Sequence, residues 1–544
     1  MTRNLAKILI ALRHFRRRTI RRDPARLWLF AVIIGAAAAY GVIGFRFAID
    51  FVSVIAFGET EEMVASGAGA LPFFRAWAAP IVGGLLVSVI LFFADRFNWL
   101  PMARGQGVAE VIEARALRDG RVSGREGLAA AAVSAVSLGS GASAGREGPA
   151  IHIGATIASV LDSKIGFTAK DRRTLLGCGA AAAVSASFNA PLAGVLFALE
   201  VIMGNYALSI FGPIAAASVT SALVTRLHLG DFPAFKAPEY GLAGVIDVPL
   251  SALLGVICGL VASVFLLFTE QMTERVRILA RDKKVPLYFL PAFAGLIVGL
   301  LGAFHPEIFG VGYEAVSRAL NGSYTLDILV TLLVLKILAT AVTVSCRFGG
   351  GVFSPGLVVG VFAGAAFGVV LGQLFPGATA SPTYYAMIGM GAASGAIIGA
   401  PISTTLIVFE LTGDYSMTIA LMVAVALATM VTQALAGKSF FHWQLARRGY
   451  DLSEGPQGVI LKTIRVRDVM NKMPQSAPLD KEAPRLELQQ SLGEALARLA
   501  NLEETGLPVV DPAEPTIIIG YLSRVKALAA YNRALIDSHI EHHT

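Results

Sequence analysis

Residues 139–149 read GSGASAGREGP and combine residue types that support two kinds of chemistry. Within this stretch, residues 141–145 match the G-x-S-x-G turn that presents a nucleophilic serine in hydrolases. Glycines followed by Pro149 also suit the start of a helix, where backbone amides and the helix dipole hold an anion. The stretch therefore predicts either a serine nucleophile at Ser143 or an anion-binding helix start.

Glu147 lies in the middle of the Arg-Glu-Gly-Pro run and needs a physical reason. An ionisable side chain in a membrane segment costs about 2.5–3.5 kcal/mol on insertion scales, so it is usually paired or functional. In the positive field of a helix start, its carboxylate can occupy the place of an anion, and its protonation then competes with anion binding. We predict that Glu147 is a protonatable gate. The alternative is a structural ion pair with Arg146 or another base.

The chain contains an internal repeat. Residues 145–154 and 351–360 share the spacing G-x3-P-x4-G at an offset of 206 residues. A second pattern opens with G-x-G and closes with A-P-x8-E, ending at Glu200 in one copy and at Glu410 in the other. Duplicated membrane halves place a binding site between the repeats, with the N-termini of broken helices aimed at an anion. The repeat thus favours transport.

The two copies predict two sets of backbone donors for a dehydrated anion. In the first copy, the donors belong to Gly145, Arg146 and Gly148; in the second, they belong to Val352 and Phe353. Glycine lets the backbone approach a ligand closely, and the first amides of a helix lack partners within the helix.

A hydrolase built on Ser143 remains an alternative. Its base would be His152, because acyl transfer needs a base within hydrogen-bond reach of the nucleophile. The second copy of the repeat has no serine–histidine pair, so this alternative leaves the repeat unexplained.

The composition identifies a polytopic membrane protein. The chain has 544 residues, of which 55% are hydrophobic and 15% are charged, against globular norms of about 45–50% and about 25%. Long apolar runs approach the roughly 20 residues that a spanning helix needs; they cover 27–44, 73–93, 250–268, 287–304 and 328–344. The three cysteines are isolated, and the histidines are scattered, so we expect no metal and no organic cofactor.

The first 26 residues form a basic arm with nine Arg or Lys residues and one acid. By the positive-inside rule, this arm is cytoplasmic and the membrane domain follows it over 27–445. We read the first apolar run as retained, because it is long and leads into further membrane sequence. The net charge of +7 comes largely from the arm and from basic loops, which favours contact with anionic lipid over nucleic-acid binding.

The motifs GREGP at 145–149, GGVFSP at 350–355 and FNAP at 188–191 resemble the CLC family of chloride channels and proton-coupled chloride antiporters. The resemblance implies an all-α inverted repeat of tilted and broken helices, with copies over about 30–225 and about 250–440. It also implies a homodimer in the cell (inner) membrane, with one anion pathway per subunit and both termini cytoplasmic. By motif position, Glu147 matches the gating glutamate.

Three positions depart from the pattern of this family. Gln106, beside Gly107, replaces the serine that faces the anion, and Phe441 replaces an anion-coordinating tyrosine. Val201 replaces the glutamate that receives protons from the cytoplasm in antiporters, although Glu200 precedes it. Valine cannot carry a proton. We therefore favour a passive anion channel over a proton-coupled antiporter, in which Glu147 and Glu200 would be candidate proton stations. Chloride is the expected anion, with nitrate and fluoride as alternatives.

After the membrane domain, the composition becomes that of a soluble protein. Residues 462–535 resemble one small α/β CBS motif, through the segments 466–470, 506–511 and 517–522, a helix-like stretch at 492–502 and a final helix near 524–534. CBS motifs work in pairs, so a partner would come from a second subunit. The alternatives are an adenine-nucleotide site and a small dimerisation or stability module, and we favour the latter.

Overall fold

The structure is a computed structural model that describes residues 24–100, 107–231, 244, 246–450, 461, 464–478, 483–502, 504–512 and 514–543. The chain divides into two units, Met1–Phe441 and His442–Thr544. Among the described residues, eight helices are long and apolar enough to cross a membrane. The expected all-α membrane unit is thereby confirmed.

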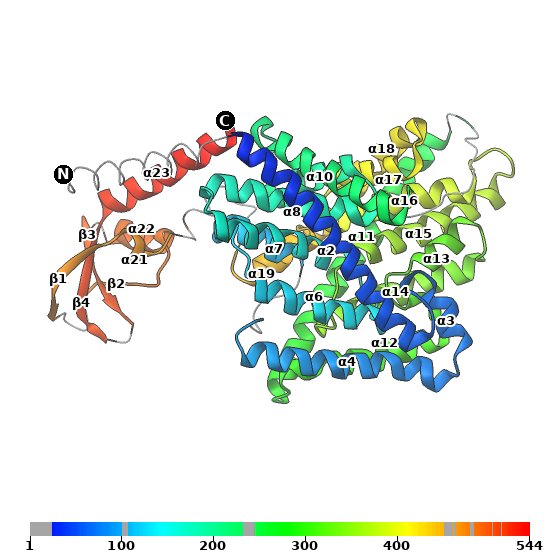
Figure 1. Ribbon diagram of the computed structural model, residues 1–544, viewed down its shortest axis with the longest axis horizontal. Helices are drawn as coiled ribbons and strands as arrows, with labels where there is room; N and C mark the ends of the chain where they lie inside the picture. Colours follow the sequence, from blue (N-terminus) through cyan, green and yellow to red (C-terminus); the bar gives the residue numbers. More distant parts are fainter. Residues whose placement is uncertain are drawn as a thin grey trace, which may run out of the picture. The chain divides into compact units, whose positions relative to one another are not determined.

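The first half of the large unit is an array of long and short helices (Figure 1). Its elements are α2 (Pro24–Phe57), η1 (Glu61–Met63), α3 (Val64–Ala70), α4 (Phe73–Arg96), α5 (Val108–Leu117), α6 (Gly124–Gly139), α7 (Glu147–Ile165), α8 (Ala169–Phe188), α9 (Pro191–Phe197), the π-helical η2 (Ala198–Met203) and α10 (Leu208–Leu229).

The second half repeats this alternation of long and short helices. Its elements are α11 (Asp247–Asp282), η3 (Leu287–Phe289), α12 (Leu290–Phe304), η4 (Pro306–Ile308), α13 (Tyr313–Leu320), α14 (Leu326–Ser345), α15 (Phe353–Leu374), α16 (Pro382–Ile398), α17 (Pro401–Thr412) and α18 (Tyr415–Ala436), followed by α19 (Phe440–Arg447). Proline is the first residue of α16 and α17 as it is of α9, where its missing N–H costs nothing.

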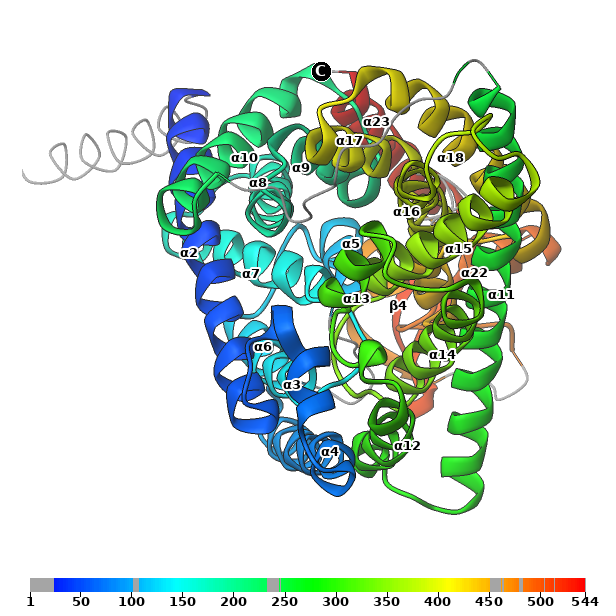
Figure 2. The ribbon, with the colours of Figure 1, turned by 90° about the vertical axis from the view of Figure 1, so that its right-hand side faces the viewer.

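Reciprocal contacts relate the two halves. Gly145 and Gly351 form an antiparallel bridge in which each N–H donates to the other carbonyl at 2.7 Å. The carboxylate of Glu200 accepts from the first amides of α17, and that of Glu410 accepts from the first amides of α9. Such exchanged contacts are what a two-fold relation produces. Figure 2 shows the first half on one side of the unit and the second half on the other.

The halves run in opposite directions through the unit. Helix α7 ends near the start of α2, where the rings of Phe30 and Phe167 lie 5.3 Å apart. Helix α15 ends near α13, because Gly368 in its last part packs against Pro382, whose neighbour Thr383 donates to the Leu320 carbonyl of α13 at 2.7 Å. Helix α13 packs against α3, which follows the far end of α2. The repeat is therefore inverted, and we call its two ends the α2-start end and the α3 end.

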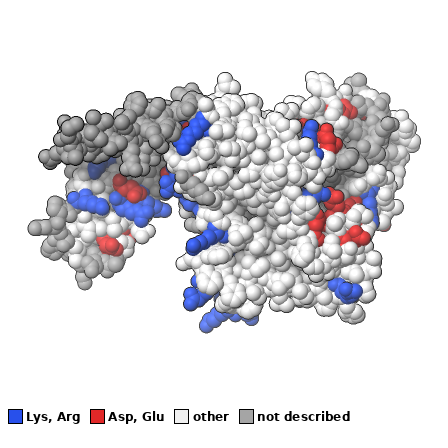
Figure 3. Space-filling view, viewed as in Figure 1, with Lys and Arg blue, Asp and Glu red and all other residues white. Residues whose placement is uncertain are grey.

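The two ends differ in charge. On the face shown in Figure 3, acidic side chains gather around α3 and α13, and basic side chains lie at the opposite end of the large unit. A band with few charged side chains separates them, as expected for a surface that faces hydrocarbon.

The small unit is an α/β fold around a four-stranded sheet of order β1-β4-β3-β2. Its elements are α21 (Val466–Val469), β1 (Asn471–Pro478), β2 (Leu486–Glu487), α22 (Leu492–Asn501), β3 (Gly506–Asp511), β4 (Glu514–Ser523) and α23 (Arg524–His543). Its core includes Leu492, Leu499, Val509 and Leu522. The expected final helix is longer than 524–534, and strand β1 was not expected.

Candidate functional site

Three helices of the large unit begin at one place. Helix α7 starts at Glu147 and α15 starts at Phe353, and neither start carries a side-chain cap. A methyl group placed on Gly148 would lie 3.4 Å from the Gly351 Cα and 3.9 Å from the Cα of Gly107, which precedes α5. The positive ends of three helix dipoles thus converge where the two halves meet.

The Glu147 carboxylate lies at this convergence and is 1% exposed. Its Oε1 accepts a hydrogen bond of 3.1 Å from the Tyr313 hydroxyl, whereas its Oε2 has no hydrogen-bond partner among the described residues. A methyl group on Gly145 would lie 2.6 Å from this Oε2 and 3.0 Å from the Ser354 nitrogen. Glycine at 145 therefore leaves the space in which the carboxylate approaches the start of α15.

Arg146 turns away from Glu147 and forms a buried ion pair on the α3 side. Its Nη1 donates to Glu61 Oε2 at 2.7 Å, and both residues are at most 5% exposed. The guanidinium carbon also lies 4.6 Å from the centroid of the Tyr313 ring. Burial raises the pKa of Glu61, and the charge of Arg146 opposes that shift. The ion pair of Arg146 is thus with Glu61, and not with Glu147.

Sequence reasoning missed Glu61 and Tyr313, which belong to the surroundings of Arg146 and Glu147. Glu61 sits in the charged run 59–62, and nothing distinguishes it there from Glu59 or Glu62. Tyr313 follows Gly310 and Gly312, and nothing in the sequence links it to Glu147.

The other predicted donors lie at the start of α15. Val352 and Phe353 are buried, and the Phe353 ring contacts the rings of Phe188 and Phe197 at centroid distances of 5.3 and 6.2 Å. These rings form an apolar wall beside the backbone amides. Phe441 is buried at the start of α19, with 5% exposure. Gln106 lies outside the described residues.

The residues of the hydrolase alternative do not pair. The Ser143 hydroxyl lies 3.3 Å from the Thr340 hydroxyl, and the His152 Nδ1 has no hydrogen-bond partner among the described residues. Ser143 is therefore not activated by His152 in this structure. Within the described residues there is also no group of His, Cys, Asp and Glu that could hold a metal ion.

The Glu200 carboxylate accepts hydrogen bonds from the start of α17. Its Oε1 accepts from the Ile402 amide at 3.1 Å and its Oε2 from the Ser403 amide at 2.8 Å, with a further bond from the Ser403 hydroxyl. Val201 follows it in the π-helical turn η2. Glu200 is therefore a helix cap in this structure.

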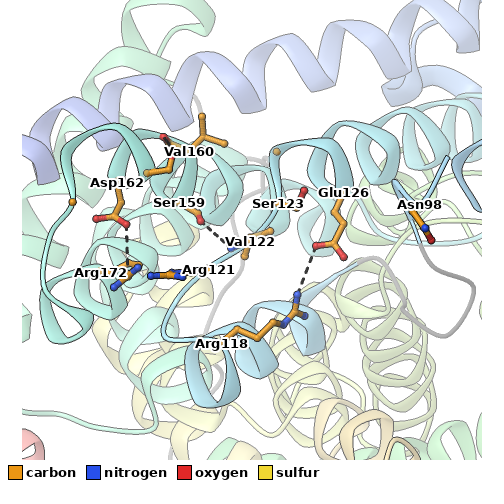
Figure 4. A pocket seen from close by; sticks show the side chains of 13 residues that line it. Asn98, Arg118, Arg121, Val122, Ser123, Glu126, Ser159, Val160, Asp162 and Arg172 are labelled. Atoms are coloured by element: carbon orange, nitrogen blue, oxygen red, sulfur yellow. Dashed lines mark hydrogen bonds and ion pairs between the residues drawn. The ribbon is translucent and has the colours of Figure 1, made fainter.

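A pocket of about 700 Å³ lies at the α2-start end, between the α5–α6 turn and the end of α7 (Figure 4). Arg118 Nη1 lies 3.6 Å from Glu126 Oε2, and Arg172 Nε lies 3.6 Å from Asp162 Oδ2. Arg121 and Ser163 at its rim are exposed, so the pocket is open to solvent.

Residues 83–433 match the family described as voltage gated chloride channel. A relative from Ralstonia nicotianae, named chloride channel protein ClcB-like, is 32% identical over 77% of this chain and 97% of its own length. A relative from Salmonella arizonae, named H+/Cl− exchange transporter ClcA, is 30% identical over 81% and 93%. The solved structure of a slow cyanobacterial Cl−/H+ antiporter has a TM-score of 0.68, with 23% identity over 78% of this chain and 98% of that one. That structure is similar in fold.

Proposed function

Because the chain belongs to the CLC family of voltage-gated chloride channels, a family of membrane proteins for anion transport, we propose that it exchanges chloride for protons and that Glu147 is its gate. The observation that carries the proposal is the buried Glu147 carboxylate, whose Oε2 has no hydrogen-bond partner where the starts of α5, α7 and α15 converge. Here the carboxylate takes the position of a bound anion. Its protonation would let it leave, and the backbone amides beside Gly145, Arg146, Gly148, Val352 and Phe353 would then bind chloride.

Exchange is favoured over a passive channel by the relatives and by the gate. The Salmonella relative is named an H+/Cl− exchange transporter, and a carboxylate that competes with the anion links proton binding to anion release. One observation favours the channel, namely Val201 at the place of the second glutamate. A passive channel therefore remains the second candidate function.

The reversal potential separates the two functions. We expect purified protein in liposomes, under a fixed chloride gradient, to show a reversal potential that an added pH gradient displaces. A reversal potential that stays at the chloride equilibrium value would instead identify a passive channel.

The gate itself is tested by Glu147→Gln, which keeps the shape of the side chain and removes its charge. We expect this variant to lose the pH dependence of chloride flux. Chloride flux with an unaltered pH dependence would remove Glu147 from the role of gate.

We also propose the arrangement of the whole protein. The basic arm of residues 1–26 makes the α2-start end cytoplasmic, both termini are cytoplasmic as the family resemblance implies, and residues 462–535 form a single CBS-like module. The family resemblance supports a homodimer. For the tail, a dimerisation or stability module is favoured over an adenine-nucleotide site. Chloride is the expected anion.

A further inference from the structure

Proton exchange requires a route from the cytoplasm to Glu147, and the usual acid is absent at Val201. The carboxylate of Glu200 already accepts hydrogen bonds from the first amides of α17. The large unit does contain other buried ionisable side chains towards the α2-start end. They lie on α5, α6 and α7, on the opposite side of the gate from Glu61.

His152 is at the centre of this group. It is 3% exposed, and its Nδ1 has no hydrogen-bond partner among the described residues, which is costly for a buried polar atom. The charged groups whose fields act on its ring are Glu110 of α5, Glu126 of α6 and Arg118 of the turn between them. Both carboxylates are at most 7% exposed.

Glu110 connects this group to the gate. A methyl group on Gly107 would lie 3.9 Å from Glu110 Oε2, so the carboxylate folds back towards the start of α5. Gly107 in turn packs against Gly148, the neighbour of Glu147 in sequence. A second buried carboxylate therefore stands beside the place where the three helix starts converge.

Glu126 and Arg118 connect the group to water. Both line the solvent-open pocket, where Arg118 bridges Glu126 at 3.6 Å and Glu113 at 3.0 Å (Figure 4). Ionisable groups thus follow one another from solvent at the α2-start end to the surroundings of Glu147.

We propose that His152 and Glu110 form the inner proton station of this transporter and replace the acid that is missing at Val201. A proton from water in the pocket binds His152 at Nδ1, the resulting imidazolium passes a proton to the Glu110 carboxylate, and Glu110 delivers it to Glu147. Each group returns to its starting charge when the proton has moved on. The inference rests on the proposed exchange function.

The test measures chloride flux and proton flux separately in liposomes for the full-length wild type and for three variants. We expect Glu110→Gln to lower proton flux at least tenfold while chloride flux persists, so that the reversal potential moves to the chloride equilibrium value. His152→Gln should act in the same direction, and it decides the matter if Glu110→Gln gives no folded protein. Glu113→Gln is the matched control, because Glu113 is a buried carboxylate of the same helix that pairs with Arg118 and is not among the groups acting on His152.

The outcomes distinguish the station from the function. Wild-type protein that moves no protons would overturn exchange, and the station with it. Coupled wild type, together with coupled Glu110→Gln and His152→Gln variants, would overturn the station alone and leave exchange standing. Loss of coupling in Glu113→Gln to the same extent as in Glu110→Gln would also overturn it, because the effect would then belong to the ion-pair cluster.

Discussion

At the scale of single residues, Tyr313 holds the carboxylate of Glu147, the proposed gate. Its hydroxyl donates to the Glu147 carboxylate, and a hydrogen bond to a charged group contributes about 1.5–3 kcal/mol. We expect Tyr313→Phe to shift the pH profile of chloride flux, because the Glu147 carboxylate then loses this hydrogen bond. The pH dependence of flux in liposomes measures this shift.

A matched control for Tyr313→Phe is Tyr385→Phe. The Tyr385 hydroxyl is also buried and donates to a carboxylate, that of Asp247 at 2.7 Å, at the start of α11. This variant should lower the melting temperature and leave the pH of half-maximal flux in place. If both variants moved the pH profile equally, Tyr313 would have no special relation to the gate.

Glu61 forms a buried ion pair with Arg146, the neighbour of Glu147 in sequence. Removing one partner of a buried ion pair destabilises a protein by roughly 3–5 kcal/mol, because the other charge stays buried and uncompensated. We expect Glu61→Gln to lower the melting temperature in detergent clearly, and to slow chloride flux because Arg146 then attracts the Glu147 carboxylate.

Glu62→Gln is the control for Glu61→Gln. Glu62 belongs to the same run but pairs with Arg46 at the surface, with 50% and 30% of the two side chains exposed. Surface pairs contribute about 0–1 kcal/mol, so little change is expected. Equal losses from both substitutions would contradict the special role of the buried pair.

Some of these residues could be predicted from the sequence, and others could not. Glu147 and the glycines around it were predictable, because an acid in an apolar Gly-rich run needs a reason and the repeat marks its place. Glu61 and Tyr313 were not, because their importance comes from contacts with Arg146 and Glu147 across 85 and 166 residues of chain.

At the scale of elements, the two carboxylates that end the repeated motif hold the halves together. Glu200 and Glu410 each satisfy two amides at the start of the other half's short helix. Losing such a cap costs about 0.5–2 kcal/mol. We expect Glu200→Ala and Glu410→Ala to lower the melting temperature by similar amounts, since the two sites are related by the repeat.

Glu274→Ala is the control for the two caps. Its side chain is 51% exposed on α11, so the melting temperature should stay close to that of the wild type. A loss in only one of the two cap variants would contradict the equivalence of the caps.

The motif spacing predicted that these elements repeat, and it did not predict their direction. Spacing is the same for parallel and inverted copies, so direction required the antiparallel bridge of Gly145 and Gly351 and the opposite courses of α7 and α15. The reciprocal caps were likewise hidden, although the glutamates of the A-P-x8-E pattern were in view.

At the scale of the whole molecule, one face of the large unit has features of a subunit interface. The helices along this face pack in the order α10, α9, α17, α18. They expose large apolar side chains, including Leu192, Leu223, Leu227, Ile402 and Met422, each at least 47% exposed. Lipid can cover such side chains. However, the half-exposed helix starts at Leu192 and Ile402 bind the carboxylates of Glu410 and Glu200 on this face. Hydrocarbon offers no partners to such polar groups, whereas a protein surface can.

We therefore expect Leu192→Trp combined with Leu223→Trp to convert the proposed homodimer into monomers, because two enlarged side chains on a self-complementary face clash with their own copies. The mass of the detergent-solubilised protein, measured by light scattering, reports the change. Leu86→Trp is the control, since Leu86 is 51% exposed on α4, away from this face. A wild-type monomer, or a dimer that persists in the double variant, would remove this face from the interface. Since each subunit contains its own Glu147 and its own three helix starts, monomers that remain folded should still carry chloride.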